Sequence, residues 1–173
     1  MEGPTFAFEN PTPMISATHL HAMLVHFPIA LLLVGFLFHL IGLFNAQPFF
    51  RKAALYLLVI GTVGTVATYL SGDEAGEGIE DGPLEAPMEA HEEAATFTLW
   101  LTVATGAFFL ALALLKYTRA WTVVIGTVLF AGVVAGISRT GYLGGQLVYQ
   151  HGAGVELGIE IPPVVGGQVG DDD

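Results

Sequence analysis

Four long apolar segments constrain the fold of this chain more than any other feature. They cover about residues 23–44, 53–70, 94–115 and 120–137. Each is close to the ~20 residues that a helix needs to cross about 30 Å of hydrocarbon. A soluble helix of this length would have a polar face, and these segments have almost none. We therefore expect an all-α fold, an integral membrane four-helix bundle that is embedded in the lipid bilayer.

The composition excludes several classes of function. Hydrophobic residues make up 53% of the 173 residues and charged residues only 12%, which is low for a soluble domain. The sequence has no cysteine, so disulfides, iron–sulfur clusters, thiolate zinc sites, covalent c-type haem attachment and a cysteine nucleophile are excluded. The formal net charge of −11 offers no basic face for nucleic acid.

The basic residues predict the orientation in the membrane. Arg51 and Lys52 lie between the first two apolar segments, and Lys116 and Arg119 lie between the last two. Short loops rich in Lys and Arg face the cytoplasm. Both termini and the loop of residues 72–92 then lie on the outer side, together with all sixteen carboxylates.

This topology divides the chain into three parts and predicts its location. Residues 1–18 form a polar outer segment, residues 19–155 form the transmembrane domain, and residues 156–173 form an outer tail. We expect a multi-pass protein of the bacterial inner membrane.

The sequence also repeats itself. Residues 59–63 (VIGTV) recur as residues 124–128, an offset of 65 positions that also places His26 onto His91. This predicts two repeated helical hairpins related by an axis along the membrane normal. His26 and His91 would then lie at the same depth, near the outer surface.

Histidines collect at the start of the first apolar segment. His19, His21 and His26 fall within eight residues, where an imidazole is costly to desolvate unless it is ligated or hydrogen-bonded. Two imidazoles that reach inward from diagonal helices can bracket one iron, as in haem-binding four-helix bundles. We therefore predict one haem b with His26 and His91 as axial ligands, and Arg139 as a partner for a haem propionate.

The other polar residues have less specific interpretations. His19, His21 and His151 are weaker ligand candidates on the outer side, and each is also interpretable as a group that caps or hydrogen-bonds a neighbouring helix. His39 lies near the cytoplasmic end, without a histidine at its repeat position, and is interpretable as a hydrogen-bonding partner of a neighbouring helix. Arg139 is equally interpretable as an arginine that extends to the membrane interface.

An acidic region that contains a histidine suggests a different kind of site. Carboxylates and imidazole are ligands for a non-haem transition metal. The residues that would supply them are Glu74, Glu77, His91, Glu92 and Glu93. The Glu-x-x-His pattern of di-iron bundles is absent from the sequence, which favours a solvated loop.

Several motifs resemble one family of bacterial membrane proteins. They are the run from His21 to Leu31 (HAMLVHFPIAL), the stretch from Ser71 to Gly76, His91-Glu92, and the run from Gly144 to Gly152 (GGQLVYQHG). Together they resemble the four-helix membrane proteins of the domain-of-unknown-function family 2231. The resemblance implies an integral inner-membrane domain. Relatives of this type are sometimes joined to c-type cytochrome modules, which supports electron transfer.

Three hypotheses for function follow. The first is a membrane-bound b-type cytochrome, or a haem-bearing subunit of a larger complex, that moves electrons between the quinone pool and a periplasmic carrier such as a cytochrome c. The second is a cofactor-free structural subunit whose acidic face docks a basic partner. The third is a transition-metal binding membrane protein. Two strong ligands leave no open iron position, so the first hypothesis predicts electron transfer without substrate chemistry.

Overall fold

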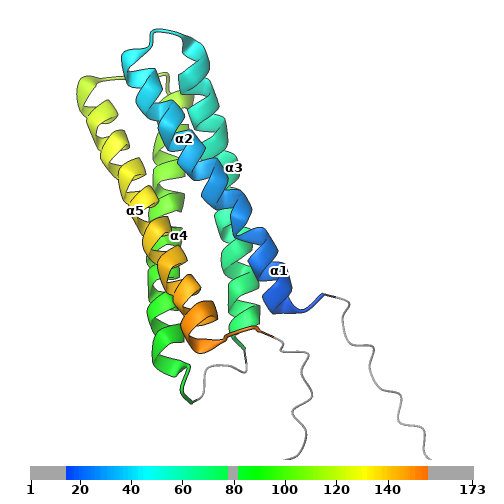
Figure 1. The fold of residues 1–173 in the computed structure, drawn as a ribbon. Coiled ribbons are helices and arrows are strands. Elements are labelled where there is room, and N and C mark those ends of the chain that lie inside the picture. The colour runs from blue at the N-terminus through cyan, green and yellow to red at the C-terminus, as the bar shows by residue number, and fades with distance from the viewer. Residues whose placement is uncertain (1–14, 78–81, 156–173) are drawn as a thin grey trace, which may run out of the picture.

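A computed structural model describes residues 15–77 and 82–155 of the chain. Within these ranges all regular secondary structure is helical. The helices are α1 (Ala17–Leu24), α2 (His26–Phe44), α3 (Pro48–Gly76), α4 (Glu85–Leu114) and α5 (Ala120–His151). Since α1 and α2 run end to end, the described residues form four rods, each long and apolar enough to cross a membrane (Figure 1).

The interruption between α1 and α2 at Val25 has a local cause in Pro28. Proline lacks a backbone N–H, and its ring clashes with the carbonyl four residues earlier, here that of Leu24. The Val25 N–H still bonds to the His21 carbonyl at 3.1 Å and caps α1. The bond from the Ile29 N–H to the Val25 carbonyl is 3.4 Å long.

The helices are longer than the spans that were predicted from the apolar segments. The third rod begins at Glu85 instead of residue 94, and the fourth ends at His151 instead of residue 137. Hydropathy marks only the part of a helix that lies in hydrocarbon, whereas good helix formers such as Glu extend it into water. The end of α5 is fixed by Gly152, whose φ of 67° is the left-handed conformation that glycine adopts at little cost.

The two ends of the bundle differ in the segments that they carry. The start of α1, the end of α3, the start of α4 and the end of α5 lie at one end, which we name the terminal end (Figure 1). The connections α2–α3 and α4–α5 lie at the opposite end, which we name the loop end. All of the basic residues except Arg139 lie at the loop end, as the predicted orientation requires.

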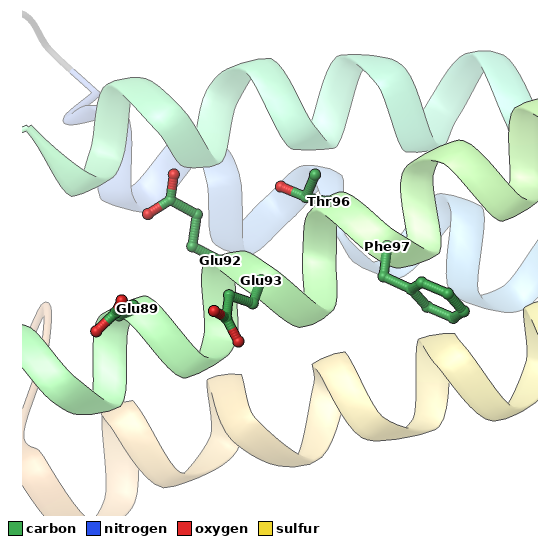
Figure 2. A pocket seen from close by; sticks show the side chains of 5 residues that line it. All are labelled: Glu89, Glu92, Glu93, Thr96 and Phe97. Carbon is green, nitrogen blue, oxygen red and sulfur yellow. The ribbon is translucent and has the colours of Figure 1, made fainter.

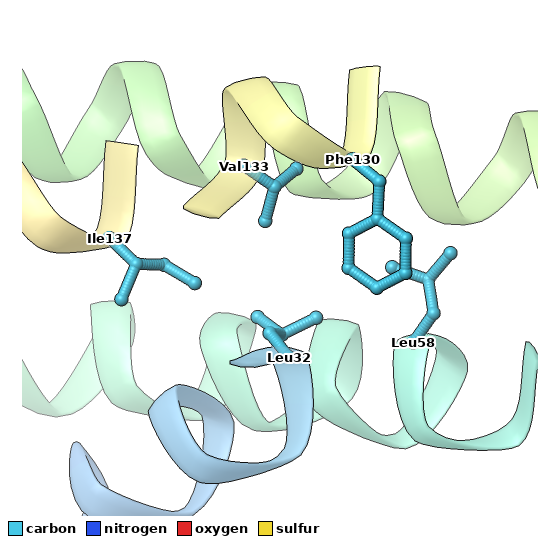
Figure 3. Close-up of a cluster of buried hydrophobic side chains, with 5 residues drawn as sticks. All are labelled: Leu32, Leu58, Phe130, Val133 and Ile137. Atoms are coloured by element: carbon cyan, nitrogen blue, oxygen red, sulfur yellow. The ribbon is translucent and has the colours of Figure 1, made fainter. Parts of the chain in front are cut away.

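The bundle is built from two hairpins. Helix α2 packs on α3 and α4 packs on α5, and the hairpins meet through α3–α4 and α2–α5. Helices α2 and α4 are therefore diagonal to each other, as are α3 and α5. The core consists of buried apolar side chains from both hairpins (Figure 3): Leu32, Leu58, Phe130, Val133 and Ile137. Glycine allows the close approach, because a Cβ on Gly61 would lie 2.8 Å from the side chain of Leu32.

The two hairpins share one type of contact, in a register that differs from the predicted repeat. Both hairpins have a histidine ring that packs on a glycine of the neighbouring helix, His21 on Gly72 and His91 on Gly144. The histidines are 70 positions apart and the glycines 72. The offset of 65 that matched His26 to His91 is therefore wrong for these contacts. It depended on a short run of small and β-branched residues, which are common at any helix packing face.

Candidate functional site

The side chain of His21 is held in one position by α3. Its Nδ1 lies 3.1 Å from the carbonyl oxygen of Thr68 and 3.1 Å from the hydroxyl of Ser71. The Ser71 hydroxyl itself donates to the Thr68 carbonyl at 2.8 Å. A carbonyl only accepts hydrogen bonds, so Nδ1 of His21 carries the proton and Nε2 of the neutral imidazole keeps a free lone pair.

The side chain of His91 has the same environment in the second hairpin. Its Nδ1 lies 3.1 Å from the carbonyl oxygen of Thr140 in α5, so this nitrogen is also the protonated one. A Cβ on Gly144 would lie 3.0 Å from the Cε1 of His91, and a Cβ on Gly72 would lie 2.8 Å from the Cε1 of His21. Each imidazole therefore occupies the space that a side chain on the glycine would fill.

The two histidines lie near each other at the terminal end. They are half-buried, and they are close enough for the charge of one imidazole to act on the other. Neither Nε2 makes a hydrogen bond to any residue that the structure describes. The bundle thus brings together two imidazoles whose Nδ1 atoms are fixed and whose Nε2 atoms are available.

The structure does not place His26 where the sequence analysis expected it. His26 is exposed and makes no hydrogen bond within the described residues, whereas His21 is the imidazole near His91. Five residues along a helix correspond to a rotation of about 140°, so His21 and His26 point in different directions. The imidazole that the structure brings near His91 is therefore that of His21.

The remaining predicted residues lie outside this pair. His19 is exposed and takes part in the start of α1, where Ser16 accepts a hydrogen bond from its backbone N–H. His151 is exposed at the last position of α5. Arg139 is exposed and lines a groove between α4 and α5 whose lining includes no histidine.

His39 has the structural role that was proposed for it. Its Nε2 lies 2.8 Å from the hydroxyl of Thr127 in α5. Its ring also packs on those of Phe109 and Phe130, with centroids 5.3 and 5.9 Å away. His39 therefore links the two hairpins near the loop end.

A surface hollow of about 370 Å³ lies over α4 near the terminal end (Figure 2). It is lined by three carboxylates and two further side chains: Glu89, Glu92, Glu93, Thr96 and Phe97. Among the described residues no three His, Asp or Glu side chains converge to hold a metal ion. The carboxylates that were considered as ligands of a non-haem metal therefore do not assemble into such a site in this part of the chain.

Comparison with known proteins places the chain in a family. The family model described as "Predicted membrane protein (DUF2231)" matches residues 17–157, which include every described helix. The chain belongs to the DUF2231 family. Searches of curated proteins and of solved structures find no match for this DUF2231 chain.

The residues that hold the histidines in this DUF2231 protein were not predicted from the sequence. Thr68 and Thr140 act through their backbone carbonyls, and a carbonyl has no signature in the sequence. The pattern Thr-x-x-x-Gly occurs at Thr68–Gly72 and at Thr140–Gly144, but also at Thr102–Gly106 and Thr122–Gly126, so it does not by itself identify the contacts. Only the first and last of these four patterns lie beside the two histidines in the structure.

Proposed function

We propose that this chain is a membrane-embedded b-type cytochrome in which His21 and His91 are the axial ligands of one haem. The observation that carries the proposal is the matching state of the two imidazoles. In each one Nδ1 donates to a helix carbonyl at 3.1 Å, and Nε2 has no hydrogen-bond partner within residues 15–77 and 82–155. Histidines that bind metals almost always donate their other ring N–H in this way, which fixes the tautomer and orients the ring.

The number of available ligands favours a haem over a bare metal ion. Structural zinc sites use four protein ligands and catalytic zinc sites use three. The described residues contain no such group. A porphyrin supplies four nitrogens of its own, so two imidazoles from the protein complete the coordination of its iron.

The surroundings of His21 also favour a bound group. The hydroxyl of Thr68 is buried without a hydrogen-bond partner, the one such side-chain atom among the described residues. It belongs to the residue whose carbonyl holds His21. A buried polar group without a partner calls for an explanation, and a polar ligand or a water molecule bound beside His21 would supply one.

The position of the pair favours electron transfer across the outer part of the bacterial inner membrane. A six-coordinate iron has no open position for a substrate, so the site would exchange electrons only. The terminal end, which we expect to face the periplasm, carries many carboxylates. They favour a basic carrier such as a cytochrome c as one redox partner. The quinone pool of the membrane would be the other partner.

A second function is favoured by the same hydrogen bonds. His21 links α1 to α3, and His91 links α4 to α5. In a cofactor-free structural subunit these links between helices would be the only role of the two imidazoles. The two functions therefore differ in the role of Nε2 alone.

The experiment that separates them replaces each histidine by asparagine. The Asn side-chain amide can donate to the same carbonyl as Nδ1, but it offers no ligand in place of Nε2. The variants are His21→Asn and His91→Asn, and the matched control is His26→Asn, because His26 is exposed on the same rod. Each protein is purified in mild detergent and characterised by a dithionite-reduced minus oxidised absorption spectrum, with haem measured per chain.

The proposal predicts a sharp reduced α band and one haem per chain for the wild type and for His26→Asn. The His21→Asn and His91→Asn variants should lose that band while their melting temperatures in the haem-free state stay close to that of the wild type. A folded wild-type protein without this spectrum, reconstituted with haem in excess, would refute the cytochrome proposal. Loss of the band in His26→Asn but not in His21→Asn would refute the assignment of the ligands.

A further inference from the structure

A groove of about 290 Å³ lies between α4 and α5, apart from the histidine pair. Its lining is mostly apolar and comes from both helices: Ala94, Phe97, Thr98, Leu101, Gly132, Ala135, Gly136 and Arg139. Glycine forms part of its floor. A Cβ on Gly132 would lie 3.3 Å from the Leu101 side chain, and a Cβ on Gly136 would lie 2.7 Å from the Thr98 hydroxyl.

One cation lies in the lining of this apolar groove. Arg139 is exposed, and it forms no ion pair with any carboxylate of residues 15–77 and 82–155. It is also the only Lys or Arg in the terminal half of the bundle. An arginine without an anionic partner at the edge of a membrane attracts an anion from its surroundings.

The depth of Arg139 indicates which anions it meets. Trp121 and Tyr142 are 55% and 66% exposed, and they lie near the two ends of the apolar part of α5. They are 21 positions apart, about 31 Å along a helix, which matches the ~30 Å of hydrocarbon between two aromatic belts. Arg139 lies one turn inside Tyr142, so its guanidinium reaches the lipid headgroups. Gly132 and Gly136 lie at the depth of the acyl chains.

We propose that this groove binds one anionic phospholipid, with its phosphate on Arg139 and an acyl chain against Gly132 and Gly136. The guanidinium provides a planar set of donors that fits a phosphate. A zwitterionic lipid would fit less well, because its choline or ammonium group places a second cation near Arg139. On the outer side the many carboxylates of the terminal end repel anionic lipids elsewhere, so binding from that leaflet would be confined to this groove.

The test compares lipid binding by native mass spectrometry of the purified chain. Phosphatidylglycerol and phosphatidylcholine with the same acyl chains are added separately in mild detergent. Two variants remove the proposed contacts: Arg139→Gln removes the cation, and Gly132→Leu fills the groove. Their controls are Lys52→Gln, which removes a cation at the loop end, and Ala131→Leu, which adds the same bulk at an adjacent exposed position of α5.

The wild type should bind one phosphatidylglycerol about tenfold more tightly than phosphatidylcholine, a difference equivalent to about 1.4 kcal/mol. Arg139→Gln and Gly132→Leu should lose this preference, whereas both controls keep it and Arg139→Lys keeps part of it.

An unchanged preference in Arg139→Gln would overturn the proposal. So would competition by inorganic phosphate alone, which would identify a free anion as the ligand. A dimer that Gly132→Leu dissociates would also overturn it, because the groove would then hold a second copy of the chain. Lipid binding is measured without the haem spectrum, so a failure of this proposal and a failure of the haem proposal are distinguishable.

Discussion

Adding one methyl group beneath either histidine should displace its imidazole. The variants are Gly72→Ala, under His21, and Gly144→Ala, under His91. The new Cβ would lie 2.8 Å from Cε1 of His21 in the first variant and 3.0 Å from Cε1 of His91 in the second. An ordinary contact begins at 3.4 Å, so the rings must move by at least about 0.6 Å and 0.4 Å.

Displacements of this size act directly on the hydrogen bonds that hold the rings. Both Nδ1–O distances are already 3.1 Å, near the long end of the normal range. Further lengthening weakens the bond that orients each proposed ligand, and loss of such a bond typically lowers metal affinity by about 10- to 100-fold. We expect a decrease in haem affinity of this order, larger for Gly72→Ala because its contact is the shorter one.

Two neighbouring glycines provide matched controls. A Cβ on Gly76 or Gly145 would meet nothing within 4 Å. Gly145→Ala should therefore bind haem like the wild type and gain up to about 1 kcal/mol from the higher helix propensity of alanine. Gly76→Ala should also bind haem normally. The assay is a haem titration of each apoprotein in detergent, followed by thermal unfolding. Equal haem affinity in Gly144→Ala and Gly145→Ala would refute the reasoning from the contact distances.

Two further predictions concern the fold and its orientation. Thr127→Val removes the hydrogen-bond partner of His39 and should lower the unfolding free energy of the bundle by about 1 kcal/mol in a denaturation assay. The control Ser138→Ala, on an exposed face of α5, should change the unfolding free energy by less than about 0.5 kcal/mol. Because the chain has no cysteine, Val155→Cys and Thr118→Cys can each be labelled alone in intact cells with a membrane-impermeant maleimide. Only Val155→Cys should react from outside, and the opposite pattern would contradict the predicted orientation.

From the sequence, the end of the bundle at which the histidines lie was easier to predict than the identity of the two histidines that lie near each other. His91 was identified as one member of the pair, and the terminal end of the bundle was identified as its position. The partner was assigned to His26 because a five-residue similarity suggested a 65-position repeat. In the structure His21 is the imidazole that lies near His91, and two of the four Thr-x-x-x-Gly patterns, those at Thr68 and Thr140, share the register of the contacts. That register was present in the sequence, but the carbonyls that define it were not visible there.

The sequence by itself determined that the chain is a membrane protein with four spanning helices. Whether a segment enters hydrocarbon depends on its own length and polarity, which are local properties of the sequence. Which histidine faces which depends on the rotation of each helix about its axis, and a shift of five residues rotates a side chain by about 140°. The interruption at Val25 and the contacts of Gly72 and Gly144 fix that rotation. Only the packing of the hairpins could therefore bring His21 to His91 and leave His26 exposed.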